Sequence, residues 1–156
     1  MKKINHFIDG NEYLGQSKRS GDVYNPALGE KIAEVSFANS DDVEQAIISA
    51  KNAFSSWSKT PPLTRSRIFF KFKELLVRDM DKLAAQVTEE HGKVLSDSIG
   101  SITRGMEVVE FMCGVPHLIK GEFSENVGSN IDSWSMRQPL GICVGITPFN
   151  FPAMVP

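Results

Sequence analysis

The segment between Pro148 and Pro152 contains the side chain best suited to chemistry. Neither proline has a backbone N–H and both fix φ, so the chain cannot continue there as a central strand and must turn. Asn150 lies between them and carries an uncharged NH2 group that donates hydrogen bonds. Such a donor can stabilise an oxygen that gains negative charge in a transition state. An ordinary polar residue of a strand-to-helix loop is the alternative, and the residues alone leave both interpretations open.

An apolar run, residues 140–146, leads into this turn. It is interrupted only by Gly141 and Gly145, which predicts a strand buried on both faces of a mostly parallel sheet. Thr147 and Pro148 should end that strand. Open α/β sheets bind ligands at the carboxyl ends of their strands, so we expect the turn to lie at a ligand-binding edge.

Arg104 is the second candidate, in the middle of an amphipathic helical pattern beside Ile102 and Met106. An arginine at such a position usually extends its charged group into solvent while its stem packs on the helix. The residues alone therefore favour a solvated side chain, and a binding role is the less favoured alternative.

The two cysteines and three histidines offer little chemistry by their spacing. Cys113 and Cys143 fall on apolar faces without a nearby histidine or cluster of positive charge, which predicts buried apolar side chains rather than nucleophiles. They form no CxxC pair and have no histidine at ligand spacing, so neither a zinc site nor a disulfide framework is expected. The isolated His6, His91 and His117 are expected to be ordinary surface or hydrogen-bonded residues.

Two β-hairpins are predicted near the N-terminus. Asp9-Gly10 favours the positive φ angles of a two-residue turn, which predicts a hairpin over residues 7–13. A second hairpin is expected over residues 22–35, turning at residues 26–29.

Four helical patterns follow the hairpins. Ser40 is the expected cap of the first helix, which has Asp41 and Asp42 in its first turn. Its predicted core stripe is Val43, Ile47, Ala50, Phe54 and Trp57. The second helix should follow Pro61-Pro62 and end near residue 79, and the third should close at Gly92 as a left-handed cap. Lys93 then favours the C-terminal dipole of that third helix.

The fourth helical pattern, residues 95–113, contains Gly100 and Gly105. Each glycine costs a helix about 1 kcal/mol relative to alanine. We therefore expect another backbone to pack closely at both positions. Beyond this helix, residues 121–138 are polar at first and then alternate like a strand, which predicts an edge hairpin.

Size and composition are those of an ordinary globular domain. The 156 residues are 41% hydrophobic and carry 17 basic against 19 acidic side chains, a net charge of −2. No basic patch points to nucleic acid or to a membrane surface, and no run approaches the roughly 18 apolar residues of a membrane span. The N-terminus is not of the signal-peptide or transit-peptide type, so we expect a cytoplasmic protein.

Five segments in order resemble the aldehyde dehydrogenase superfamily: Phe7-Ile8-Asp9-Gly10, Asn25-Pro26-Ala27, Glu90-His91-Gly92-Lys93, residues 104–111, and Pro148-Phe149-Asn150-Phe151-Pro152. The last has phenylalanine where the superfamily usually has tryptophan. With Gln138-Pro139-Leu140-Gly141-Ile142 before it, this segment is similar to the CoA-acylating methylmalonate-semialdehyde dehydrogenase branch. The resemblance covers nearly the whole chain.

The resemblance implies the fold. It is the N-terminal part of a Rossmann-type α/β domain without a GxGxxG fingerprint, built from opening β-hairpins, about four helices, a β arm and the first buried parallel strand. Residues 1–120 and 139–156 would belong to the NAD-binding domain. Residues 121–138 would form a β arm for homo-oligomerisation.

The resemblance also implies the site. Asn150 would be the oxyanion donor, and Arg104 would hold the carboxylate of a malonate-type semialdehyde, which a planar guanidinium suits. Thr147 and Phe149, with Ile146 and Pro148 shaping the same wall, would contact the nicotinamide half of NAD. No metal is expected.

The implied reaction forms propionyl-CoA or acetyl-CoA, CO2 and NADH from a semialdehyde, NAD and coenzyme A. Superfamily members place the nucleophilic cysteine well beyond the asparagine motif, so we expect the isolated chain to be inactive. Two alternatives remain at this point: a hydrolytic aldehyde dehydrogenase of another branch, and a non-catalytic assembly or interaction fragment.

Overall fold

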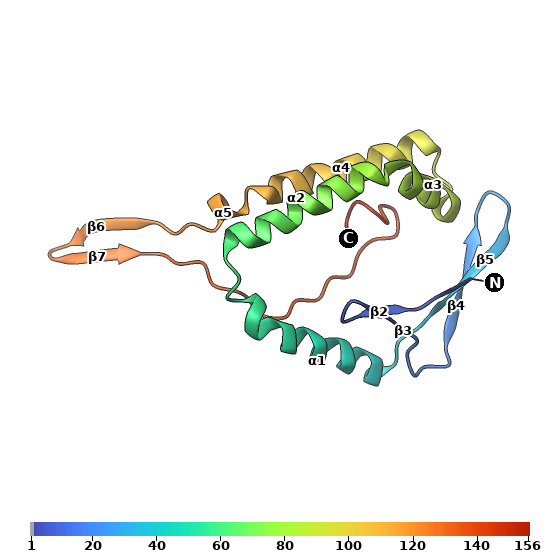
Figure 1. The fold of residues 1–156 in the computed structure, drawn as a ribbon, viewed down its shortest axis with the longest axis horizontal. Helices are drawn as coiled ribbons and strands as arrows, with labels where there is room; N and C mark the ends of the chain where they lie inside the picture. The colour runs from blue at the N-terminus through green and yellow to red at the C-terminus, as the bar shows by residue number, and fades with distance from the viewer. Residues whose placement is uncertain (1) are drawn as a thin grey trace.

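A computed structural model describes residues 2–156 of the chain (Figure 1). The described part contains seven strands and five helices. In chain order the first strands are β1 (Lys2–Ile4), β2 (His6–Ile8), β3 (Asn11–Tyr13), β4 (Ser20–Asn25) and β5 (Glu30–Ser36). They are followed by α1 (Ser40–Trp57), α2 (Pro62–Arg78), α3 (Met80–His91), α4 (Leu95–Cys113), α5 (Val115–Leu118), β6 (Phe123–Gly128) and β7 (Ile131–Trp134). None of the helices in this part of the chain is long and apolar enough to cross a membrane.

Both N-terminal hairpins form as predicted. β2 and β3 pair antiparallel across Asp9 and Gly10, whose φ angles are 55° and 73°. β4 and β5 pair antiparallel, with Gly29 at a φ of 69° in the turn between them. β1 adds to the free edge of β5 in parallel, giving the strand order β1-β5-β4. The sequence did not predict this pairing, because three residues carry too little periodicity to identify a strand.

The main core lies where α3 and α4 pack together, and α2 lies along α4 in the same layer (Figure 1). Ala84, Val87 and Ile102 are buried there, with Met80, Leu83 and Ile99 packed against them. Two hydrogen bonds of hydroxyl groups tie the layer together. The hydroxyl groups of Thr88 and Ser98 are 2.9 Å apart, and Ser66 donates to the Cys113 carbonyl oxygen at 2.5 Å.

α1 lies apart from this layer and begins with a capping box. The Asn39 side chain accepts the Asp42 N–H at 2.9 Å, and Asp42 accepts the Asn39 N–H at 3.0 Å. The prediction of Ser40 as the cap is therefore wrong by one residue, since Asn39 has the extended backbone that a cap needs. The predicted core stripe of α1 is only partly covered, because Val43 and Trp57 at its two ends are exposed.

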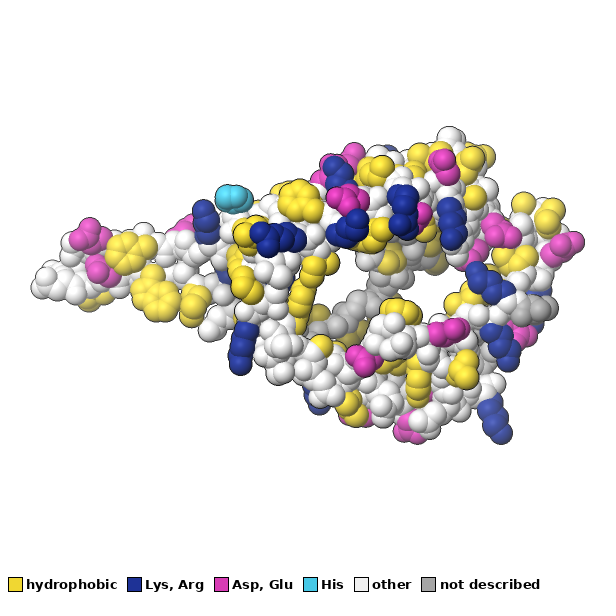
Figure 2. Space-filling view, viewed as in Figure 1, with side chains coloured by type: hydrophobic (Ala, Val, Ile, Leu, Met, Phe, Trp, Pro, Cys, Tyr) yellow, Lys and Arg dark blue, Asp and Glu magenta, His cyan; other side chains and the backbone are white. Residues whose placement is uncertain are grey.

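The hairpin of β6 and β7 projects away from the rest of the molecule (Figure 1). Its large apolar side chains, Phe123, Val127, Ile131 and Trp134, are all exposed. Figure 2 shows such side chains along this arm, with nothing packed over the face in view. The expected hairpin is confirmed, and its apolar surface is unusual for a free edge.

The C-terminal segment runs between α1 and the α2–α4 layer, and Figure 2 shows the molecule hollowed between these two parts. Residues 140–146 do not form the predicted buried strand. Leu140 is 94% exposed, Ile146 is 97% exposed, and no strand is found from residue 135 to residue 156. A central strand needs neighbours on both sides to satisfy its N–H and C=O groups, and the described residues supply no parallel neighbour there.

Candidate functional site

The turn that carries Asn150 spans residues 149–154 and follows the extended segment directly. Pro148 and Pro152 bracket it as the sequence predicts, and the Val155 N–H donates to the Phe151 carbonyl oxygen at 3.3 Å. Asn150 is exposed at the start of this turn, whereas Phe151 is half-buried. Asn150 is thus solvent-accessible in a turn whose following residues are held against the helices.

α4 holds the far end of the turn by close backbone contact. A Cβ on Gly105 would lie 3.2 Å from Met154 Cα and 3.3 Å from the Met154 carbonyl oxygen. The expected close packing is therefore confirmed at Gly105. It is wrong at Gly100, where a Cβ would have nothing within 4 Å.

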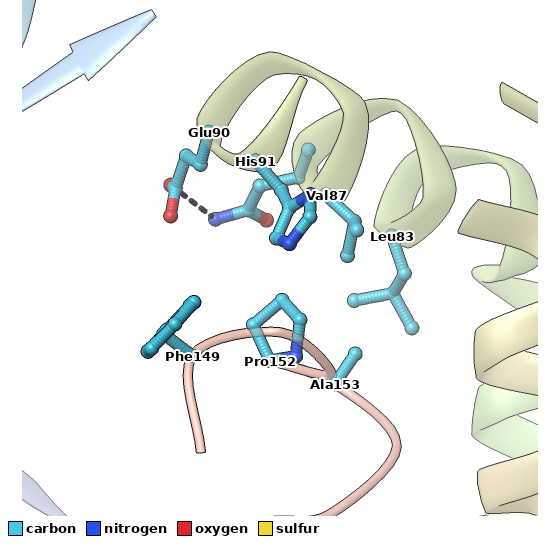
Figure 3. Close-up of a pocket in the computed structure, with 8 residues that line it drawn as sticks. Leu83, Val87, Glu90, His91, Phe149, Pro152 and Ala153 are labelled. Atoms are coloured by element: carbon cyan, nitrogen blue, oxygen red, sulfur yellow. Dashed lines mark hydrogen bonds between the residues drawn. The ribbon is translucent and has the colours of Figure 1, made fainter. Parts of the chain in front are cut away.

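The C-terminal end of α3 holds the near end of the turn. Phe149, Pro152 and Ala153 line a cavity of about 380 Å³ with residues of α3 that include Val87 and His91. Figure 3 shows the His91 ring directed toward the turn, beside the hydrogen bond that Gln86 donates to Glu90. His91 Nδ1 is buried without a hydrogen-bond partner among residues 2–156. The expectation of an ordinary surface or hydrogen-bonded histidine is therefore wrong for His91, which is a wall of this cavity.

Phe151, the residue after Asn150, packs against a lysine side chain. Lys93 Nζ is 4.2 Å from the centroid of the Phe151 ring, within the range of a cation–π contact. Phe151 and Lys93 line one cavity with Arg104 and with Ser101, which is buried in α4. Lys93 therefore does more than favour the dipole of α3.

Arg104, the predicted substrate residue, is related to Asn150 only through Phe151, and Asn150 is not among the residues that line the Arg104 cavity. Arg104 is exposed on α4 and shares a cavity with Phe151, which directly follows Asn150 in the chain. The predicted nicotinamide residues lie just before them. Ile146, Thr147 and Pro148 are exposed in the extended segment, and the Phe149 ring is 89% exposed.

Neither cysteine belongs to this site. Cys143 is exposed rather than buried as predicted, and it lines a separate cavity against α1 with Val144 and Val43. Cys113 is half-buried at the end of α4. Both predictions of a buried side chain fail because the segments around these residues are only partly covered. Within residues 2–156, no group of three histidine, cysteine or acidic side chains could hold a metal ion.

Sequence reasoning missed Lys93, Ser101 and Phe151 as possible site residues. One signal was present: Asp97, Ser101 and Arg104 recur every three or four residues and so form a polar stripe along the first part of α4. Lys93 precedes that helix, and no pattern in the sequence indicates that it meets Phe151.

Comparison with known proteins places the chain among one group of enzymes. A model described as the aldehyde dehydrogenase family matches residues 13–156. The chain is 46% identical to the malonate-semialdehyde dehydrogenase of Pseudomonas aeruginosa, over all of the chain and 31% of that protein. It is also 46% identical to the mitochondrial, acylating methylmalonate-semialdehyde dehydrogenase of Arabidopsis thaliana, over 99% of the chain and 25% of that protein.

Solved structures agree. The methylmalonate-semialdehyde dehydrogenase of Oceanimonas doudoroffii superposes with a TM-score of 0.95 at 50% identity, over 99% of this chain and 32% of that one. A Sinorhizobium meliloti protein named as the same enzyme and complexed with NAD superposes with a TM-score of 0.95 at 48% identity, over 99% of this chain and 32% of that one. The chain therefore spans about a third of the length of the proteins it matches.

Proposed function

The chain belongs to the aldehyde dehydrogenase family, and we propose that it supplies the N-terminal part of an NAD-dependent, CoA-acylating malonate- or methylmalonate-semialdehyde dehydrogenase. The complete enzyme would convert a semialdehyde, NAD and coenzyme A into acetyl-CoA or propionyl-CoA, CO2 and NADH. The observation that carries this proposal is the shared cavity of Arg104 and Phe151, because it lies next to Asn150. This adjacency along the chain supports placing an oxyanion donor and a carboxylate anchor in one site.

Asn150 would act on the aldehyde oxygen. When a thiolate adds to the aldehyde carbon, the carbonyl oxygen becomes an alkoxide, and the exposed NH2 group of Asn150 can donate a hydrogen bond to it. The amide is neutral, so it stabilises this charge without losing a proton. The thiolate would come from residues outside this chain, because Cys143 and Phe149 line separate cavities and Cys113 lies at the end of α4.

Arg104 would hold the substrate's carboxylate. Its guanidinium is charged at all working pH values and matches a carboxylate with two parallel hydrogen bonds. A substrate anchored there by its acid group would present its aldehyde end to the adjacent Asn150.

The residues before the turn would receive the cofactor. Ile146 and Phe149 are 97% and 89% exposed, so they offer the bare apolar surface that a flat nicotinamide ring needs, with Thr147 and Pro148 between them. NAD, when bound, would accept the hydride that leaves the aldehyde carbon. These four residues orient the ring and exclude water on one side of it.

Assembly would involve the projecting arm. Residues 121–138 contain β6 and β7, whose exposed apolar side chains suit contact with a second copy in a homo-oligomer. Residues 1–120 and 139–156 would be parts of one NAD-binding domain.

The test uses the enzyme extended to the length of its relatives. Asn150→Ala is expected to lower kcat by about 100- to 1,000-fold with little change in KM, because the lost hydrogen bond strengthens only in the transition state. Asn52→Ala on the exposed face of α1 is the matched control and should leave kcat unchanged. An Asn150→Ala enzyme within threefold of the parent would overturn the assignment.

Product analysis separates acylation from hydrolysis. Mass spectrometry should find an acyl-CoA when coenzyme A is present, whereas free acid formed at the same rate with or without coenzyme A would indicate a hydrolytic enzyme. The 156-residue chain alone should form no NADH, because it lacks a thiol beside Asn150.

A further inference from the structure

The cavity beneath Arg104 contains a second cation. Lys93, Asp97, Ser101, Arg104 and Phe151 line it, and it opens at the N-terminal half of α4. Lys93 Nζ is held over the Phe151 ring at 4.2 Å, so the ammonium group lies beside the aromatic wall. Two basic side chains from different segments thus converge on one small space.

Neither cation is neutralised by its surroundings. The ion pairs found among residues 2–156 include neither Lys93 nor Arg104, although Asp97 lines the same cavity. The lining therefore carries two positive charges against one negative charge, and the negative one is more than 4 Å from both. A cavity with net positive charge attracts an anion.

Hydrogen-bond donors support the same conclusion. Ser101 is only 4% exposed, and its hydroxyl has no partner among the described residues. The cap of α4 is Val94, which makes no side-chain cap hydrogen bond, so the positive end of the helix dipole is offset only by Asp97 in the first turn. An incoming anion would meet both features in the same cavity, which Ser96 and Ser101 both line.

We propose that Lys93 is the second cation of a carboxylate site that it forms with Arg104. The ligand is the ionised acid group of a short aldehyde, and identifying it as an aldehyde rests on the function proposed above. Phe151 is one residue from Asn150, and consecutive Cα atoms are about 3.8 Å apart. A short aldehyde, whose acid group and carbonyl are only a few bonds apart, would suit a site that spans these two adjacent residues. Ser101 supplies a further donor, and Asp97 opposes the anion.

Malonate is the probe, titrated into the 156-residue chain and followed by the backbone amide resonances of residues 93–104. Lys93→Met, which keeps the length of the side chain and removes its charge, should weaken malonate binding about fivefold, as expected for one partly exposed ion pair. Lys82→Met on α3 is the matched control and should bind like the parent. Asp97→Asn should bind more tightly, and raising the salt concentration should weaken binding to the parent.

Binding by Lys93→Met equal to the parent, or an equal loss in Lys82→Met, would overturn the proposal. The result is independent of Asn150, because Asn150→Ala should bind malonate normally even where it abolishes catalysis.

In the full-length enzyme, Lys93→Met should lower kcat/KM for malonate semialdehyde and leave that for uncharged propanal unchanged. An equal loss with both substrates would show that Lys93 only positions the turn.

Discussion

Gly105 and Gly100 form a natural pair for testing how the Asn150 turn is held. Both lie inside α4, so replacing either by alanine removes the same conformational cost of glycine in a helix. They differ in their surroundings. A methyl group on Gly100 would meet nothing within 4 Å, whereas one on Gly105 would lie 3.2 Å from the Met154 backbone.

Because their surroundings differ, the two substitutions should change the free energy of unfolding by different amounts. Gly100→Ala should raise the free energy of unfolding by about 1 kcal/mol, the usual difference between alanine and glycine inside a helix. That corresponds to a melting temperature about 2–4 °C higher for a chain of this size. Gly105→Ala gains the same helix propensity but must push the turn away by a few tenths of an ångström, and overpacking of this kind costs about 1–3 kcal/mol. The free energy of unfolding of Gly105→Ala should therefore equal that of the parent or be lower.

Urea unfolding followed by helical circular dichroism measures both changes, and hydrogen exchange locates the displacement. Amides of residues 149–155 should exchange faster in Gly105→Ala and at the parent's rate in Gly100→Ala. Equal stabilisation in the two variants, with unchanged exchange in the turn, would show that α4 does not hold the turn.

Two further predictions concern the start of α1. Asn39→Ala should lower the free energy of unfolding by about 1 kcal/mol in thermal unfolding, because it removes one half of the capping box, whereas Ser40→Ala should change it by less than about 0.5 kcal/mol. Equal losses would contradict the cap. The pKa of Asp42 is lowered from 3.8 mainly by the hydrogen bond from the Asn39 N–H, with a further one from the Gln16 N–H, and burial opposes the shift. Its contribution to stability is therefore fully present above pH 3.8 and is lost as the pH falls through the lowered folded value. Stability measured against pH should fall less steeply below pH 4 for Asp42→Asn than for the parent, and parallel curves would refute this account.

Features that depend on neighbours in the chain could be predicted from the sequence. The turn at Asp9-Gly10, the left-handed cap at Gly92 and the bounds of α4 all form as expected. The first two depend on the backbone freedom of glycine, and the third depends on apolar residues that recur every three or four positions. Each of these signals involves residues that are close together in the sequence. The cap of α1 was misplaced by one position, since Asn39 and Ser40 are both good caps and only the backbone conformation distinguishes them.

Features that depend on distant partners could not be predicted in the same way. The apolar run at residues 140–146 has the composition of a buried strand, yet a strand also needs neighbours, and residues 2–156 provide none beside it. The same lack of cover leaves Cys143 exposed. The composition of a segment indicates which of its side chains can be buried, but it does not indicate which other elements pack over them.

Local backbone preferences and periodicity act along the chain, so the residues alone were enough to predict the four long helices, the hairpins and the proline-bracketed turn that contains Asn150. The contact of Lys93 with Phe151, and the cavity that both share with Arg104, depend on how the chain packs in three dimensions. Lys93 and Phe151 are far apart in sequence, and only the packing of the turn against α3 and α4 brings their side chains within reach of one another.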